Sequence, residues 1–332
     1  MNDTHPLALP KGAELSKGDG SSKGTELWFT VLRWFDSWAG LEHMRVDGPA
    51  KVDWLRCIPI IAVHLMCLGV FVVGWSWTAV GVAVAFYFVR MFAITGWYHR
   101  YFSHRTFKTS RACQFVFALL GASCAQRGPL WWASHHRHHH IASDTPDDVH
   151  SPRHGGFLWS HIGWFTSRKF FAPRLKSIGD FAKYPELRFL DRFDILIPTI
   201  AGFGMFGLGK LLEVYAPSLG TNGPQMLIWG FFVSTVALIH GTCTINSLSH
   251  VYGSQRYDTG DDSRNNFWLA LITLGEGWHN NHHYYAASTP QGFYWWEIDI
   301  TYYLLRAMQA VGLVWDIREV PMHVREGKNK AA

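Results

Sequence analysis

The chain has 332 residues, of which 48% are hydrophobic and 16% aromatic, and its formal net charge is +5. Its mean hydropathy is about zero, because long uncharged segments alternate with stretches dense in His, Arg and Asp. The five cysteines lie in apolar segments without a CxxC pair, which excludes a disulfide framework. The Lys and Arg residues form no single basic helix or arm, so the composition argues against a nucleic-acid partner.

Polar tails are expected at both ends of the chain. Residues 1–25 are rich in Gly, Ser and Lys and lack the apolar core of a signal peptide, which predicts a disordered cytosolic tail. Residues 26–50 are predicted to be an amphipathic interfacial segment, since Leu27–Leu41 carries apolar residues at helical spacing. We assign residues 51–320 to one membrane domain and residues 321–332 to a C-terminal tail.

Four segments of roughly 18 to 20 residues are apolar enough to cross a bilayer. They are Ile58–Trp75, Thr78–Trp97, Ile195–Leu212 and Met226–Ile245. Ala112–Gln126 is too short to span, so we predict a core or re-entrant helix. Residues 293–315 are aromatic but contain Glu297, Asp299 and Arg306, and we predict an amphipathic helix on the membrane surface. Arg90 and Lys210, inside two spans, are expected to snorkel towards an interface.

Four spans place both termini and every His-rich stretch on one face of the membrane. The loop over residues 99–192 on that face is rich in Arg and Lys, whereas the opposite loops, near Ser76 and from Ala216 to Pro224, carry neither. By the positive-inside rule the His-rich face is cytosolic. The predicted fold is therefore an all-α integral membrane protein with four transmembrane helices and a cytosolic helical cap.

The 19 histidines are concentrated in a few motifs. "HRYFSH" contains His99 and His104, "HHRHHH" covers residues 135–140, "HNNHH" contains His279, His282 and His283, and "NSLSH" contains Asn246 and His250. The second motif allows two ligand frames, one with His135, His138 and His139 and the other with His136, His139 and His140.

Helical spacing predicts which of these side chains can share a metal ion. Residues i and i+4 lie on one helix face, which pairs His136 with His140, His279 with His283, and Asn246 with His250. His99 and His104 are five residues apart and would be rotated by about 140° on an α-helix. They are therefore expected to suit two different metals.

The number of imidazoles indicates a two-metal site. One zinc ion takes four ligands at most in structural sites and three plus water in catalytic ones, so eight or nine clustered imidazoles exceed one zinc. Imidazole suits Fe, Zn and Cu. Hydrolytic two-zinc sites usually include bridging carboxylates, and the motifs contain no Asp or Glu. All-nitrogen ligation at a membrane surface favours redox iron that activates O2.

The ordered motifs resemble the membrane fatty acyl desaturases, especially the acyl-CoA delta-9 (stearoyl-CoA) type. The resemblance runs from about Trp54 to Val320. Its most specific stretches are "GWYHRYFSHRTFKTS", "GGFLWSHIGW", "NSLSHVYGSQRYDTGDDSRNN" and "GEGWHNNHH". It implies a di-iron site in the cytosolic cap, with O2 as co-substrate and a cis-monounsaturated product.

The resemblance also assigns individual residues. It implies that the second motif begins at His136, so that the ligands there are His136, His139 and His140, while His135 and His138 are not ligands. It further implies that His250 is a ligand and that Asn246 holds a metal-bound water. The implied ligands are His99, His104, His136, His139, His140, His250, His279, His282 and His283.

The residues expected to contact the substrate match the acyl-CoA desaturases only in part. Arg168 and Lys169 match a basic pair that contacts CoA phosphates in the acyl-CoA enzymes, but the Arg-Asp common before the second motif is Ser134-His135 here. This departure leaves acyl carrier protein and phospholipid-bound chains open. Glu276 is expected to orient an imidazole or to cap a helix, and His150 to give polar support.

No cytochrome b5-like domain with haem-ligating histidines follows the last predicted helix, so we expect a separate electron donor of the ferredoxin, rubredoxin or cytochrome b5 type. The predicted topology suits a bacterial inner membrane or the endoplasmic reticulum. A rival hypothesis within redox chemistry is a fatty acid decarboxylase that makes terminal alkenes, or an alkane hydroxylase. Hypotheses of another class are a zinc-dependent membrane hydrolase and a non-catalytic metal-binding lipid sensor.

Overall fold

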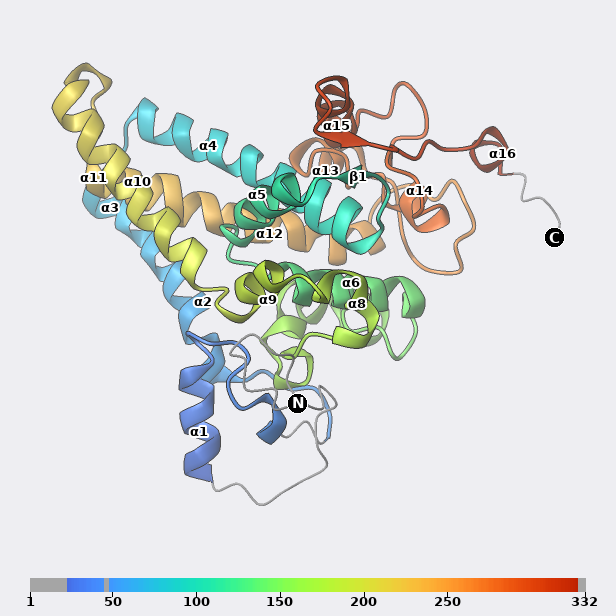
Figure 1. Cartoon of the computed structure of the whole chain (residues 1–332), viewed down its shortest axis with the longest axis horizontal. Coiled ribbons are helices and arrows are strands. Elements are labelled where there is room, and N and C mark those ends of the chain that lie inside the picture. The colour runs from blue at the N-terminus through green and yellow to red at the C-terminus, as the bar shows by residue number, and fades with distance from the viewer. Residues whose placement is uncertain (1–22, 45–47, 328–332) are drawn as a thin grey trace. The chain divides into compact units, whose positions relative to one another are not determined.

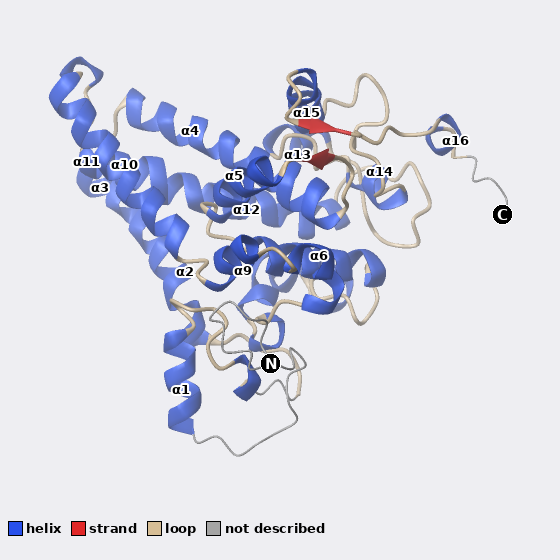
Figure 2. Ribbon diagram, in the orientation of Figure 1, coloured by secondary structure: helices blue, strands red, loops and turns tan. Residues whose placement is uncertain are grey.

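The structure is a computed structural model that describes residues 23–44 and 48–327 (Figure 1). The chain divides into two compact units. The first unit comprises residues 1–90, 119–134 and 163–239, and the second comprises residues 91–118, 135–162 and 240–332. Helices dominate the described residues (Figure 2). The strands β1 (Lys108–Thr109) and β2 (Val314–Trp315) form one antiparallel pair in the second unit. The prediction of a helical protein is confirmed.

Four helical segments are long and apolar enough to cross a membrane, and they overlap the four predicted spans. They run over Trp54–Val73, Trp77–Ser103, Leu196–Tyr215 and Gly223–His250. The first contains α2 (Trp54–Met66) and α3 (Val70–Val73), the second α4 (Trp77–Phe92), the third α10 (Leu196–Tyr215), and the fourth α11 (Gly223–Gln225) and α12 (Ser234–Asn246). The shorter apolar helix α5 (Arg111–Ala122) is not among them, as predicted.

The two hairpins of spans are joined at their tips within the first unit. The side-chain amide of Gln225 donates to the carbonyl of Val73 at 2.9 Å, and the Trp229 indole N–H donates to the carbonyl of Gly74 at 2.9 Å. Glycine permits close packing behind these contacts, because a Cβ on Gly209 would lie 2.4 Å from the Asn222 carbonyl oxygen. Small residues at such crossings are typical of helices packed in lipid.

The snorkelling predicted for Arg90 is wrong. Its guanidinium is fully buried, donating to the carbonyl of Ser123 at 3.2 Å and to the hydroxyls of Ser234 at 2.7 Å and Thr235 at 2.8 Å. It also lies 4.0 Å from the centre of the Phe86 ring. Four partners inside the first unit replace water, so the side chain has no need to reach an interface. Lys210 is exposed and lies 3.0 Å from Glu213, and its snorkelling stays a prediction.

Shorter helices complete the two units. The first unit contains α1 (Lys23–Leu32), α8 (Gly179–Ala182) and α9 (Pro185–Arg192), and α6 (Pro129–Ala142) runs from the first unit into the second. The second unit contains α7 (Pro152–Gly155), α13 (Phe267–Ile272), α14 (His279–Tyr284), α15 (Ile300–Ala310) and α16 (Met322–Arg325). Within the predicted interfacial segment, residues 26–50, the helix α1 ends at Leu32. Residues 1–22 and 328–332 of the predicted tails lie outside the described residues.

The helix predicted over residues 293–315 forms only over residues 300–310, as α15. The Glu297 carboxylate accepts the backbone N–H of Phe293 at 2.7 Å, and the Asp299 carboxylate accepts those of Gln291 at 2.7 Å and Tyr302 at 3.0 Å. These two acids therefore hold a turn and then cap the start of α15. Helical periodicity alone did not reveal that they bind backbone instead of facing water.

Candidate metal centre

Five of the implied ligands meet in one group, which we name cluster A. Its members are His99, His104, His136, His140 and His282, whose candidate ligand atoms all lie within 4.8 Å of one another. They come from the end of the second span, from α6 and from α14. All five lie in the second unit, so this unit by itself assembles the group.

The remaining four implied histidines form a second group, which we name cluster B. Its members are His139, His250, His279 and His283, and it also lies wholly within the second unit. The Nε2 atoms of His250 and His279 are 3.1 Å apart. A third group, His139 with Asp148 and His150, overlaps cluster B through His139.

The expectation that His99 and His104 suit two different metals is wrong in its geometry, since both belong to cluster A. Residues 93–103 form a π-helix, and the backbone N–H of His104 donates to the His99 carbonyl at 3.2 Å. In a π-helix the i to i+5 hydrogen bond stacks residues five apart, whereas an α-helix rotates them away from each other. The two imidazole centres are consequently 4.9 Å apart.

The histidines of the two ligand frames in "HHRHHH" lie in different surroundings. His136 and His140 lie in cluster A and His139 in cluster B, whereas His135 and His138 belong to neither cluster. The ring of His138 contacts the Asp147 carbonyl at 3.1 Å, and His135 is buried. Arg137 donates to the carbonyls of Phe102 at 2.7 Å and Ser103 at 3.0 Å, which ties this part of α6 to the π-helix.

Helix α14 is held in place by the residues between and before its histidines. The Asn280 side chain accepts the backbone N–H groups of Arg256 and Tyr257, each at 2.8 Å. Gly277 has no room for a side chain, because a Cβ there would lie 2.1 Å from the backbone nitrogen of Ala270. These contacts account for Gly277 and Asn280 in "GEGWHNNHH" and were not predicted.

The nitrogen positions in cluster A fit a bound cation better than hydrogen bonds between rings. The His136 Nε2 lies 2.9 Å from that of His104 and 3.0 Å from that of His140. An imidazole nitrogen carries one hydrogen or one lone pair, so it can satisfy only one such neighbour in its plane. A metal at about 2.0–2.1 Å from each nitrogen would leave neighbouring nitrogens about 3 Å apart. The residues therefore fit a metal ion.

Carboxylates contact the outer nitrogens of four ligands. The Nδ1 atom of His250 lies 2.8 Å from Asp144, that of His139 3.1 Å from Asp148, and that of His283 2.6 Å from Asp261. Glu276 contacts the Nδ1 atom of His99. A carboxylate at Nδ1 holds the proton there and leaves the Nε2 lone pair for a metal.

The pKa shifts are consistent with neutral imidazoles and ionised carboxylates. Burial and neighbouring imidazoles hold the pKa of five histidines well below the usual value, namely His104, His136, His140, His279 and His282. Burial lowers the pKa of His283 to about 4, although Asp261 opposes this shift. Burial would raise the carboxyl pKa of Asp144, Asp148, Asp261 and Glu276, but their charged or hydrogen-bonded partners lower it overall.

Comparison with known proteins identifies the family of this chain. The fatty acid desaturase family profile matches residues 75–318. The chain belongs to the fatty acid desaturase family. It is 34% identical over 273 residues to an sn-1 stearoyl-lipid 9-desaturase of Anabaena variabilis, covering 81% of this chain and 94% of that protein. It is 35% identical over 295 residues to an acyl-CoA 5-desaturase of Anemone leveillei, covering 85% of this chain and 87% of that protein.

Family membership makes this desaturase an oxidoreductase that acts on fatty acyl chains. It also supports an integral membrane protein, together with the four apolar helical segments. Membership of an oxidoreductase family argues against a zinc-dependent hydrolase and a non-catalytic lipid sensor.

Asn246, a further expected site residue, lies where the helix α12 ends. Asn246 is the last residue of α12, and its backbone carbonyl accepts the Ser160 hydroxyl at 2.6 Å. The helix does not continue regularly from Asn246 to His250, because Ser247 separates α12 from the 3-10 turn Leu248–His250. The i and i+4 argument, which assumes a regular α-helix, therefore does not apply directly to this pair, and the role of Asn246 stays a prediction.

The expected basic pair is not free to act as two cations. The Arg168 guanidinium, in the first unit, lies 3.0 Å from a Glu26 carboxylate oxygen and 3.0 Å from one of Asp53. Lys169 is exposed.

Ser134, which stands where the acyl-CoA enzymes commonly have Arg, is fully buried. Its hydroxyl donates to the Trp131 carbonyl and accepts the Arg174 backbone N–H.

Proposed function

We propose that the protein converts a long-chain saturated acyl chain into its cis-monounsaturated product at the delta-9 position. The reaction removes two hydrogens from adjacent methylene carbons. Together with one O2, two electrons and two protons it yields the alkene and two water molecules. The observation that carries this proposal is the gathering of nine histidines into clusters A and B, without an acidic side chain among the ligands.

We further propose that each cluster holds one iron ion, and that Asn246 holds a metal-bound water. Bound iron would supply the O2 activation and the hydrogen abstraction that desaturation requires. The chain's own contribution is to present Nε2 lone pairs and to keep the protons at Nδ1, through Asp144, Asp148, Asp261 and Glu276.

The expected acyl carrier is CoA, with Lys169 and Arg168 as phosphate contacts. Because Arg168 is already paired with Glu26 and Asp53, a phosphate would have to displace those carboxylates. The names of the relatives include both acyl-CoA and acyl-lipid desaturases. Both carriers therefore belong in the test.

The electron donor is proposed to be a separate ferredoxin, rubredoxin or cytochrome b5 type of protein with its reductase. The metal centre and both termini are proposed to lie on the cytosolic face, as the positive-inside rule predicts. This arrangement suits a bacterial inner membrane or the endoplasmic reticulum.

The test supplies the purified, iron-loaded protein with O2 and an electron-donor system. Stearoyl-CoA, a stearoyl glycerolipid and free stearic acid are compared in parallel, and products are located by mass spectrometry of derivatised double bonds. We expect an internal cis alkene at carbon 9 from the CoA ester. A terminal alkene one carbon shorter, or an alcohol, would contradict desaturation, and product from the glycerolipid alone would contradict the proposed carrier.

A further inference from the structure

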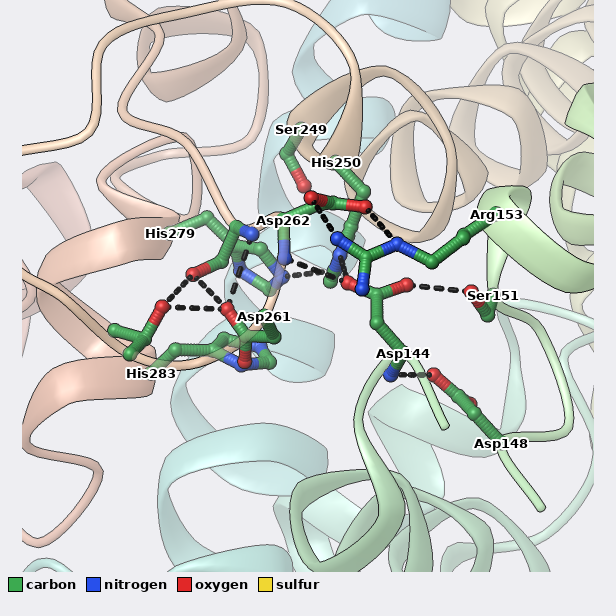
Figure 3. A network of polar contacts seen from close by, with 12 residues as sticks. Asp144, Asp148, Ser151, Arg153, Ser249, His250, Asp261, Asp262, His279 and His283 are labelled. Carbon is green, nitrogen blue, oxygen red and sulfur yellow. Dashed lines mark hydrogen bonds and ion pairs between the residues drawn. The ribbon is translucent and has the colours of Figure 1, made fainter. Parts of the chain in front are cut away.

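Clusters A and B differ in the side chains that contact the Nδ1 atoms of their imidazoles. In cluster B, three of four ligands contact an aspartate through Nδ1: His139 with Asp148, His250 with Asp144 and His283 with Asp261. Figure 3 shows the Asp144 and Asp261 contacts from close by. In cluster A, His99 contacts Glu276, whereas the described side-chain contacts of His104, His140 and His282 are with other imidazoles.

The aspartates behind cluster B are fixed by contacts of their own. Asp144 accepts the Ser151 hydroxyl at 2.5 Å and the backbone N–H of Asp262 at 2.8 Å. Its backbone φ of 54° lies in the left-handed region, which is uncommon for a residue other than glycine. Asp148 in turn accepts the Asp144 backbone N–H at 2.9 Å. These contacts hold the carboxylates in position independently of the imidazoles.

Asp261 is held in a similar way by the loop that follows Tyr257. It accepts the Thr259 hydroxyl at 2.6 Å and the Ser263 backbone N–H at 3.0 Å. The next residue, Asp262, forms a two-point ion pair with Arg153, at 2.5 and 2.8 Å. Figure 3 shows that this pair joins the Asp261 loop to the segment that carries Asp144 and Ser151.

The carboxylate behind cluster A is partly neutralised. The Glu276 side chain lies 3.2 Å from the buried Arg100 guanidinium, which also pairs with Asp299 at 3.0 Å. It further accepts the Gln291 side-chain amide at 2.8 Å. Its negative charge is therefore shared with a cation, which reduces its effect on the His99 imidazole.

A carboxylate that accepts the Nδ1 proton makes the imidazole a stronger electron donor, and loss of one such partner typically lowers metal affinity about 10- to 100-fold. Cluster A has one more imidazole than cluster B. Against that additional neutral ligand, three fixed carboxylates contact the imidazoles of cluster B, whereas Glu276, which contacts His99 of cluster A, is partly neutralised. The additional negative charge close to a divalent ion favours cluster B.

We propose that the two metal positions are unequal, with cluster B binding its divalent ion more tightly than cluster A. Cluster B then fills first, and the ion in cluster A is lost first to a chelator. This inference rests on the proposed function only in that both clusters hold a metal.

The test titrates metal-free, full-length protein in detergent with Co²⁺ under anaerobic conditions, in a chelator-buffered series. Cobalt absorption and elemental analysis follow binding. We expect two ions per chain, in steps separated by at least about 10-fold in dissociation constant. Two ions bound in one step would overturn the inference, even if the iron-loaded enzyme desaturates its substrate. Fewer than two ions would overturn both the inference and the proposed di-iron function.

Two matched variants assign the steps to the clusters. Asp261→Asn is expected to weaken the tight step about 10- to 100-fold and leave the weak step unchanged. Glu276→Gln is expected to weaken only the weak step. The reverse assignment would overturn the inference. Asp144→Asn repeats the first comparison if Asp261→Asn is recovered in low yield, and elution as a single monodisperse species is required of each variant.

Discussion

His138 provides a sharp test of the ligand frame, with its neighbour His139, which belongs to both frames, as the reference ligand. His139 is buried in cluster B, with Asp148 behind it, whereas His138 contacts the carbonyl of Asp147 and belongs to neither cluster. Four-ligand metal sites in small zinc domains bind with about 10–16 kcal/mol, so one ligand of four is worth roughly 3–4 kcal/mol. Since 1.4 kcal/mol is tenfold, His139→Ala should weaken metal binding in cluster B about 100- to 1,000-fold.

The assay compares His138→Ala and His139→Ala with the parent protein, all purified identically. Iron per chain is measured by elemental analysis, and product is measured in the desaturation assay. We expect His139→Ala to lose about one iron per chain together with its activity, and His138→Ala to keep both. Loss of iron and activity from His138→Ala would refute the frame that begins at His136, because His138 belongs only to the other frame. Full iron and activity in His139→Ala would contradict both frames.

Three further predictions concern the scaffold. Gly277→Ala should lower the amount of folded, metal-binding protein sharply, because its Cβ would lie 2.1 Å from the Ala270 nitrogen, and monodisperse yield with iron content measures this. Arg90→Lys should destabilise the first unit by about 1–3 kcal/mol, since buried hydroxyls and a carbonyl lose their partners; an unchanged thermal midpoint in detergent would contradict the packing. Asp191 is buried, which raises its carboxyl pKa from 3.8 to about 6. Its protonation therefore stabilises the fold below pH 4, and this contribution, up to about 3 kcal/mol, is lost as the pH rises through 6. The difference in thermal midpoint between parent and Asp191→Asn should change over that range and stay constant above it.

The apolar helical segments and the gathering of the nine histidines are the parts that the sequence predicts best. Long uncharged segments leave few alternatives to a helix long enough to cross a bilayer. The nine histidines are implied by the resemblance of their ordered motifs to the desaturase family, and the structure brings them together in clusters A and B. The prediction that Arg90 snorkels is wrong because hydropathy measures only how apolar a segment is. It does not show that Ser123, Ser234 and Thr235 accept hydrogen bonds from the Arg90 guanidinium inside the protein.

The carboxylates around the metal centre were mostly missed, and the reason is physical. Asp144, Asp148 and Asp261 lie in loops, where no helical or strand period relates a residue to the histidine it will contact. A signal was nevertheless present in "SDTPDDVH" and "DTGDDS", where acids stand among turn-forming residues next to His motifs. Glu276 was singled out as an orienting acid, but its partner is His99, which is distant in the sequence, and not the nearby His279.

The π-helix over residues 93–103 has a consequence for how the first histidine motif works. An α-helix with the same sequence would turn His104 away from His99 by about 140° and would remove one ligand from cluster A. Inserting one alanine between Arg100 and Tyr101 would place the histidines six residues apart and break the i to i+5 register. Deleting Tyr101 would place them at i+4, which an α-helix can accommodate on one face. If the spacing serves to put both rings in one cluster, the deletion should retain more metal than the insertion, measured as iron per chain in folded protein. Equal loss in both variants would instead indicate that the π-helix is required for packing of the surrounding aromatic residues, such as Trp97 and Tyr98, and not for ligand geometry.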